Sequence, residues 1–133
     1  MKLVAGGVLA VALLVSLPAS ASDMTFVTHD CLHTRMEPEH IMFACGDGNF
    51  YVNHLQWRSW QRLRAVARGV YHFNDCQPDC ADGTFHTRRG KLVLRERLWC
   101  PKVSRHVFRR ARVTYDHPWQ GRQRFSFKLY CPL

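Results

Sequence analysis

The chain has 133 residues, of which 47% are hydrophobic, and 19 Lys plus Arg against 10 Asp plus Glu give it a formal net charge of +9. This length leaves room for one domain, and the composition excludes a collagen-like, low-complexity or wholly disordered chain. Six cysteines in so short a chain are typical of a secreted, cross-linked domain.

The first residues predict a signal peptide over residues 1–21. Lys2 supplies a positive end, residues 3–17 are apolar, and 18–21 (PASA) give a small-residue site with cleavage before Ser22. The apolar run is shorter than the roughly 20 residues of a membrane-spanning helix. Cleavage would remove only Lys2 among the charged residues and lower the net charge from +9 to +8. We therefore expect a secreted protein with no transmembrane segment in its mature chain.

The mature chain divides into an arm and one domain. Polar residues and Pro38 predict an irregular N-terminal arm over 22–39, tied down by Cys31. Residues 40–133 show no repeat or linker and predict a single β-rich domain. At its start, an apolar run over 40–45 and a strand-like segment over 50–57 flank the turn-forming residues 46–49 (GDGN), which indicates a β-hairpin.

Residues 60–73 fit either a helix or a strand. A strand would place Arg62, Arg64 and Arg68 on one side and no charged residue on the other, whereas a helix would spread the arginines more widely. Alanine and leucine favour a helix by propensity. We predict a strand, because the one-sided charge is the stronger pattern.

The remaining segments alternate in the same way. Residues 74–83 form a loop, and 90–100 are a strand in which Glu96 falls on the apolar side, so we expect a bulge or a salt bridge there. A strand over 107–115 is broken by 116–118 (DHP), and 124–131 alternate most regularly. The pattern predicts an all-β fold, an antiparallel β-sandwich or small barrel stabilised by disulfides.

The cysteines predict three disulfides, with fifteen possible connectivities. They are Cys31, Cys45, Cys76, Cys80, Cys100 and Cys131. A metal site over His72, Cys76, Cys80 and His86 is the alternative, but an oxidising compartment favours disulfides and this spacing matches no standard zinc site. We expect no metal and no cofactor.

Three motifs carry a resemblance. CGDGN at 45–49, LxWxxW at 55–60 and NDCxPxCAxGxFH at 74–86 are similar to a family of small secreted actinobacterial proteins of unknown function, and 113–115 (VTY) resemble its late strand. The match covers about residues 38–116 and departs from the family at Arg88 and Arg89, where a Tyr-Pro pair is usual. The resemblance implies an exported, β-rich, single-domain protein and no particular activity. It does not settle the disulfides, and we expect Cys45 to pair with Cys76 or Cys80.

A basic strand face is the main functional signal. Four predicted strands place cations on their polar side, where guanidinium groups suit bidentate contacts with phosphate, sulfate or carboxylate. The candidate anion-binding residues are Arg62, Arg64, Arg68, Arg95, Arg97, Arg110, Arg112, Arg124 and Lys128, and Arg122 shares their alternation. Aromatic residues that could stack on bases or sugars have the same parity, namely Trp60, Trp99, Phe108 and Tyr130. The alternative is that arginine only solubilises exposed strands and discourages edge pairing.

Catalytic motifs are scarce. No GxSxG, SxxK or phosphate-binding glycine loop is present, and Glu96 with His86 or His106 is the only acid–base combination that a ribonuclease-like hydrolase could use. Asp75, Asp79 and Asp82 lack the spacing of an EF-hand and are interpreted as turn residues rather than calcium ligands. We expect a secreted protein without enzymatic activity that binds polyanions, such as envelope polymers, glycans or nucleic acid. The alternatives are a small secreted hydrolase and a module that recognises a protein partner through an apolar patch around Trp57, Trp60, Trp99 or Trp119.

Overall fold

The computed structural model describes residues 23–133, and the predicted signal peptide lies outside them. A short 3-10 helix, η2 (Pro101–Val103), joins β6 to β7, two of the eight strands in the described residues. The strands are β1 (Thr25–Thr28), β2 (Thr34–Arg35), β3 (Ile41–Met42), β4 (Phe50–Trp60), β5 (Arg64–Asn74), β6 (Phe85–Cys100), β7 (Arg105–Trp119) and β8 (Arg122–Lys128). In this part of the chain, no helix is long and apolar enough to cross a membrane.

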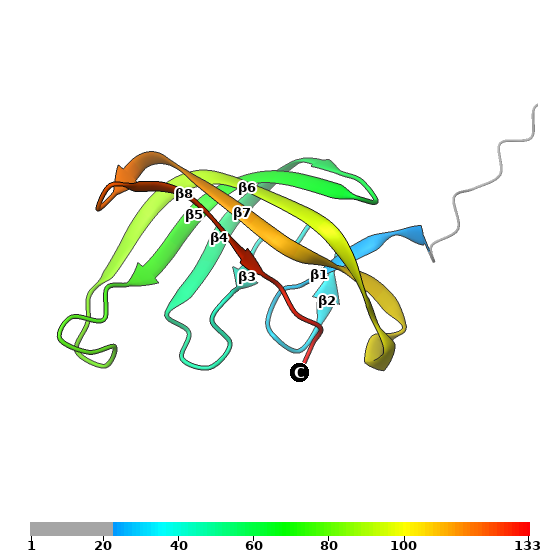
Figure 1. The fold of residues 1–133 in the computed structure, drawn as a ribbon, viewed down its shortest axis with the longest axis horizontal. Helices are drawn as coiled ribbons and strands as arrows, with labels where there is room; N and C mark the ends of the chain where they lie inside the picture. The colour runs from blue at the N-terminus through cyan, green and yellow to red at the C-terminus, as the bar shows by residue number, and fades with distance from the viewer. Residues whose placement is uncertain (1–22) are drawn as a thin grey trace, which may run out of the picture.

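The strands form one curled sheet, a half-barrel, in the order β2-β1-β7-β6-β5-β4-β3, with β8 beside the second half of β7. All pairings are antiparallel except that of β1 with β7. Figure 1 shows the long strands arching over the loops and the short N-terminal strands. The predicted all-β, antiparallel, disulfide-stabilised fold is confirmed.

The segment over 60–73 is a strand, as the one-sided charge predicted, but it begins at Arg64 because 61–63 turn between β4 and β5. Its alternate residues Ala65, Ala67 and Tyr71 are fully buried on the concave side. Leu92 of β6 and Val113 of β7 are equally buried. The period of two along each strand therefore separates a hydrophobic interior from a solvent face.

The N-terminal arm is more regular than predicted, because β1 and β2 join the sheet. Val27 is fully buried, and the backbone N–H of Met42 donates to the carbonyl of His29 at 2.8 Å, which links the arm to β3. The indole N–H groups of Trp57 and Trp60 donate to the carbonyls of Pro38 and Thr25, both at 2.9 Å. The arm thus covers the core between β7 and β4.

Two strand irregularities matter for the surface. Glu96 has a φ of 58° and its carboxylate accepts a hydrogen bond from Arg110 at 2.9 Å, so the predicted bulge or salt bridge is confirmed. The predicted break at 116–118 is wrong, because β7 continues to Trp119. Its pairing with β8 shifts register between Thr114 and Trp119, and such an irregular edge tolerates Pro118 without a lost ladder hydrogen bond.

The three disulfides join Cys31 to Cys45, Cys76 to Cys80, and Cys100 to Cys131. The prediction that Cys45 pairs with Cys76 or Cys80 is wrong. Cys45 follows β3, which hydrogen-bonds to the segment just before Cys31, whereas Cys76 and Cys80 lie in one loop and close it.

Candidate functional site: a basic face on the curled sheet

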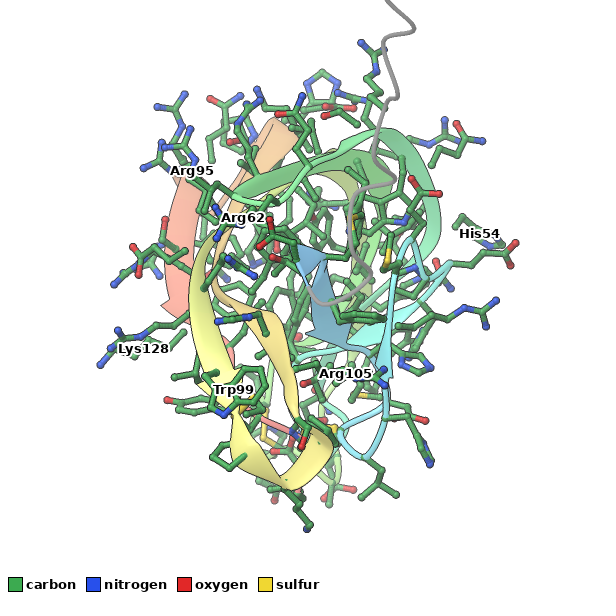
Figure 2. The ribbon with its side chains drawn as sticks, turned by 90° about the vertical axis from the view of Figure 1, so that its right-hand side faces the viewer. His54, Arg62, Arg95, Trp99, Arg105 and Lys128 are labelled. Carbon is green, nitrogen blue, oxygen red and sulfur yellow. A yellow bond between two sulfur atoms is a disulfide. The ribbon has the colours of Figure 1, made fainter. Side chains whose placement is uncertain are left out.

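A row of four cations crosses the convex side of the sheet. Its members occupy the same level of β5, β6, β7 and β8 and are direct cross-strand partners. Their chain neighbours Ala65, Leu94 and Ala111 are fully buried, so the row points to the solvent. This cation row consists of Arg64, Arg95, Arg110 and Lys128. Arg95 and Lys128 project outward on the same side in Figure 2.

Further cations extend the row into a basic face. Arg68, Lys91 and Arg124 belong to a second transverse row, in which Thr114 stands on β7. Arg112 lies between the two rows, and Arg89 lies one level beyond the second, opposite Val70. The basic face thus comprises Arg64, Arg68, Arg89, Lys91, Arg95, Arg110, Arg112, Arg124 and Lys128. Arg89 and Lys91 were not among the predicted site residues, although both share the alternation of Arg95.

Few carboxylates balance this charge. Arg110 pairs with Glu96 at 2.9 Å, and Arg68 pairs with Asp116 at 2.6 Å. Within residues 23–133, the other seven cations of the basic face form no ion pair. Like charges directly opposite each other across strands are destabilising. The cation row is therefore an electrostatic cost to the fold.

Arg62 and Arg97 lie apart from the basic face. Arg62 stands in the turn before β5, and its Nε is 2.9 Å from a carboxylate oxygen of Asp23. The side chain of Arg97 is only 11% exposed, faces the same carboxylate at 4.0 Å and stands opposite the buried Phe108. Both arginines thus hold the start of the arm.

The predicted aromatic partners divide as well. Trp60 ends β4 and packs edge-to-face on the fully buried Phe108 at 5.5 Å, so the prediction that both share the arginine face is wrong. Trp99 and Tyr130 are 49% and 69% exposed. Trp57 and Trp60 pack against the core, so neither is the centre of an exposed apolar patch for a protein partner.

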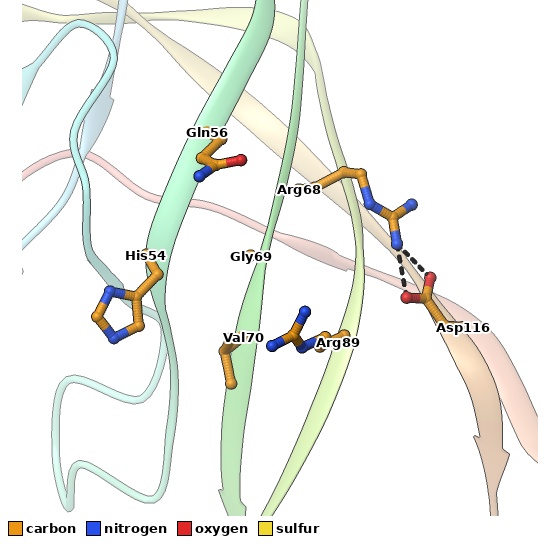
Figure 3. Close-up of a pocket in the computed structure, with 7 residues that line it drawn as sticks. All are labelled: His54, Gln56, Arg68, Gly69, Val70, Arg89 and Asp116. Atoms are coloured by element: carbon orange, nitrogen blue, oxygen red, sulfur yellow. Dashed lines mark hydrogen bonds and ion pairs between the residues drawn. The ribbon is translucent and has the colours of Figure 1, made fainter.

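The basic face has a hollow of about 320 Å³, shown in Figure 3. It forms because β4 bulges away from β5 between Asn53 and Gln56, where His54 has a φ of 51°. A Cβ on Gly69 would lie 2.9 Å from the carbonyl oxygen of Asn53, so the bulge requires glycine there. The lining residues are His54, Gln56, Arg68, Gly69, Val70, Arg89 and Asp116.

Two polar groups of the hollow can hold an anion. The guanidinium of Arg89 points from β6 toward Val70 in Figure 3, whereas Arg68 reaches across to Asp116. Arg89 forms no ion pair within the described residues, and His54 stands on the opposite wall. The hollow can therefore accept one phosphate, sulfate or carboxylate group beside Arg89.

The predicted acid–base combination is not brought together. Glu96 is occupied by Arg110, and His86 lies ten residues away along β6, about 30 Å at the rise of a strand. His106 stands opposite Trp99, and burial, followed by the positive charges of Arg97 and Arg62, lowers its pKa.

Sequence reasoning missed a different pair, His86 with Asp75. The Nε2 of His86 is 2.8 Å from a carboxylate oxygen of Asp75. That contact, followed by the donated backbone N–H groups of Thr84 and Gln77, lowers the pKa of Asp75 to about 2. In the sequence, only their positions on either side of the 76–80 loop indicated that the two residues could meet.

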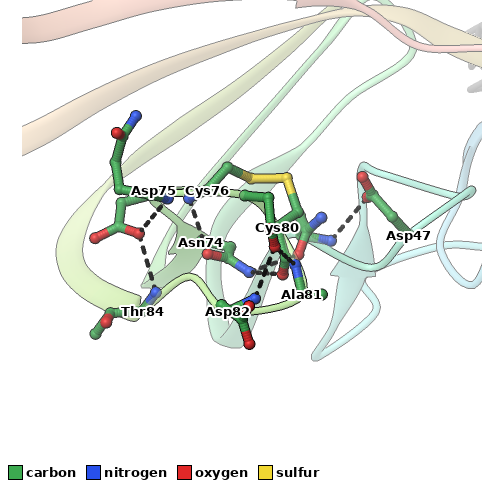
Figure 4. The surroundings of a disulfide bond; sticks show 11 residues. Asp47, Asn74, Asp75, Cys76, Cys80, Ala81, Asp82 and Thr84 are labelled. Atoms are coloured by element: carbon green, nitrogen blue, oxygen red, sulfur yellow. Dashed lines mark hydrogen bonds between the residues drawn. A yellow bond between two sulfur atoms is a disulfide. The ribbon is translucent and has the colours of Figure 1, made fainter.

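Figure 4 shows the loop closed by Cys76 and Cys80. The carboxylate of Asp79 accepts the backbone N–H groups of Ala81 and Asp82, and the Asn74 side chain donates to the carbonyl of Cys80 at 2.8 Å. Asp75 and Asp79 are thus turn residues, as predicted, and Asp82 lies in the same turn and takes part through its backbone N–H. The alternative metal tetrad is divided, since its cysteines are bonded to each other and His72 hydrogen-bonds to Asn53 at 3.0 Å.

Comparison with known proteins adds no relative. No family model matches the chain, and no match was found among curated proteins or among solved structures.

Proposed function

We propose that this chain is a secreted protein that binds anionic polymers through its basic face and carries out no catalysis. The observation that carries the proposal is the cation row, in which Arg64, Arg95, Arg110 and Lys128 stand in register across four strands. Adjacent strands are about 4.8 Å apart, so the row presents a dense line of positive charge about 14 Å long.

Solubility alone accounts poorly for this arrangement. A soluble surface intersperses charges of both signs, and cross-strand pairs gain stability when opposite charges face each other. The basic face instead sets like charges side by side and provides two carboxylate partners, Glu96 and Asp116. A bound polyanion would relieve this repulsion and release its own counterions.

The chemistry favours repeated anionic groups. Arginine predominates over lysine on the face, and its guanidinium forms forked hydrogen bonds with phosphate, sulfate and carboxylate. The hollow beside Arg89 offers one recessed contact at the edge of the basic face. Phosphate-rich envelope polymers, acidic glycans and single-stranded nucleic acids all present such groups.

Further observations support export of the protein and a binding role rather than catalysis. The predicted signal peptide indicates export, and three disulfides suit an oxidising compartment. The separation of Glu96 from His86 and its pairing with Arg110 favour a binding role over the hydrolase alternative.

A binding titration across salt concentrations tests the proposal. The probes are a single-stranded oligodeoxynucleotide and heparin, measured by fluorescence anisotropy between 50 and 300 mM NaCl on residues 22–133. We expect log affinity to fall linearly with log salt, with a slope of about −0.7 per phosphate contact for the single strand.

A matched pair of variants assigns the effect to the face. Arg95→Gln with Lys128→Gln should weaken binding and flatten the slope, whereas Arg35→Gln with Lys102→Gln removes the same charge elsewhere and should change little. Affinity that does not depend on salt, or equal losses in both double variants, would overturn the proposal.

A further inference from the structure

The concave side of the half-barrel holds a second hollow, separate from the basic face. It has a volume of about 220 Å³ and opens where β4 and β5 meet the far ends of β7 and β8. Five aromatic rings and one cation line it, namely Phe50, Phe73, Tyr115, Trp119, Phe125 and Arg122. We call it the aromatic pocket.

The rings hold one another in fixed orientations. Phe73 packs edge-to-face on Trp119 at 5.3 Å, and Phe125 packs edge-to-face on Tyr115 at 5.5 Å. The ring of His86, anchored by Asp75, lies 4.4 Å from Trp119. Rigid aromatic walls of this kind are typical of pre-formed small-molecule sites.

A glycine permits the close pairing of β6 with β7 beside the pocket. Gly90 of β6 stands directly opposite Tyr115, and a Cβ at this position would lie 2.6 Å from the carbonyl oxygen of Thr114. The pairing of β6 with β7 therefore requires glycine at this position, next to the Tyr115 ring that lines the pocket.

Arg122 enters the pocket because of a register shift. The pairing of β7 with β8 changes between Thr114 and Trp119, so Arg122 stands opposite Trp119 rather than in line with Arg124 on the basic face. Arg122 forms no ion pair within the described residues. The guanidinium of Arg88 lies 4.5 Å from the centre of the Trp119 ring.

These charges select the ligand. An aromatic cage can attract a cation, but here Arg88 already occupies one face of Trp119 and Arg122 stands at the rim. A positively charged ligand would be repelled, and no carboxylate of the described residues lines the pocket. The volume is below the 300–1,000 Å³ of sites for drug-sized molecules, so the occupant is small.

We propose that the aromatic pocket binds a small aryl carboxylate, whose ring stacks among the aromatic side chains while its carboxylate is held by Arg122. This inference does not rest on the proposed binding of polyanions, because the two sites lie on opposite sides of the sheet.

The test uses 2-naphthoate as the probe and calorimetry on residues 22–133. Its uncharged amide, 2-naphthamide, measures the contribution of ring stacking without the charge. Decanoate carries the charge on an acyl chain in place of an aromatic ring. We expect 2-naphthoate to bind at least about tenfold more tightly than either, since a charge-assisted hydrogen bond is stronger than a neutral one. An excess of the oligodeoxynucleotide should not displace it.

Two variants of one strand provide the control. Arg122→Gln should lower the affinity for 2-naphthoate about tenfold and leave that for 2-naphthamide unchanged. Arg124→Gln removes the same charge two residues away, on the basic face, and should leave both unchanged. Equal affinity for acid and amide, tighter binding of decanoate, equal losses in the two variants, or no binding at millimolar concentration would each overturn the proposal.

Discussion

Replacement of Arg95 by glutamate should stabilise the free protein while weakening its binding of polyanions. Arg95 stands between Arg64 of β5 and Arg110 of β7, and both are its direct cross-strand partners. The substitution turns two like-charge pairs into two opposite-charge pairs. The carboxylate of Glu96, bound to Arg110, opposes the change.

The register of the strands sets the size of the expected change in the free energy of unfolding. A cross-strand charge pair contributes about 0.2–1 kcal/mol, and two such pairs change sign while Glu96 offsets part of the gain. We expect the free energy of unfolding to rise by about 0.5–1 kcal/mol at low ionic strength. At 1 M salt the Debye length is about 3 Å, shorter than the spacing between strands, so the gain should largely disappear.

Urea unfolding at 20 mM and at 1 M NaCl, followed by tryptophan fluorescence with the disulfides intact, measures the effect. Arg35→Glu, on β2, makes the same charge change away from the basic face and should alter stability less. A loss of stability for Arg95→Glu at low salt, or a gain that persists at 1 M, would refute the electrostatic account of the cation row.

Three other perturbations test the core, the cross-links and the loop. Tyr71 is fully buried, and its hydroxyl has no hydrogen-bond partner in the described residues. Tyr71→Phe should therefore raise the free energy of unfolding or leave it unchanged. A loss of stability above about 1 kcal/mol in urea unfolding would contradict this. Loop-closure entropy makes a disulfide more stabilising the further apart its cysteines lie in sequence, and the separations are 31 residues for Cys100–Cys131, 14 for Cys31–Cys45 and 4 for Cys76–Cys80. Removing each bond by paired Cys→Ser changes should lower the free energy of unfolding by about 4, 3 and 2 kcal/mol in that order, measured by the same unfolding assay. The pKa of Asp75 is lowered to about 2, so the Asp75 carboxylate stabilises the fold above its unfolded pKa, and this contribution is lost as the pH falls toward 2. Asp75→Asn should therefore reduce the fall in the free energy of unfolding between pH 5 and pH 2, measured in acid titrations. An unchanged fall would be inconsistent with the His86–Asp75 contact.

Local alternation was enough to predict the fold class and most of the basic face. In 64–74 the period of two separates Arg64 and Arg68 from Ala65 and Ala67, and this separation outweighed the helix propensity of alanine. The turn at 46–49 was equally predictable from the sequence, because Gly48 adopts the positive φ, 68°, that the GDGN sequence favours. These features depend on neighbours within a few residues.

The errors arose where a position depends on a distant segment. Parity along one strand assigns Arg97 to the same face as Arg95, but Arg97 faces Asp23, which is 74 residues away in sequence. Parity likewise assigns Arg122 to the face of Arg124, yet a register shift against β7 places it beside Trp119. The same limit explains the disulfides, because Cys45 meets Cys31 only when the arm pairs with the sheet.

Both candidate sites depend on this difference between local and distant information. The basic face repeats one alternation in four strands, so it is visible in the sequence before any strand order is known. The aromatic pocket gathers Phe50, Tyr115 and Phe125 from three strands and needs the shifted register of β8 to bring Arg122 to its rim. A face made by regular pairing is predictable from periodicity, whereas a pocket made by a departure from regular pairing requires the folded sheet.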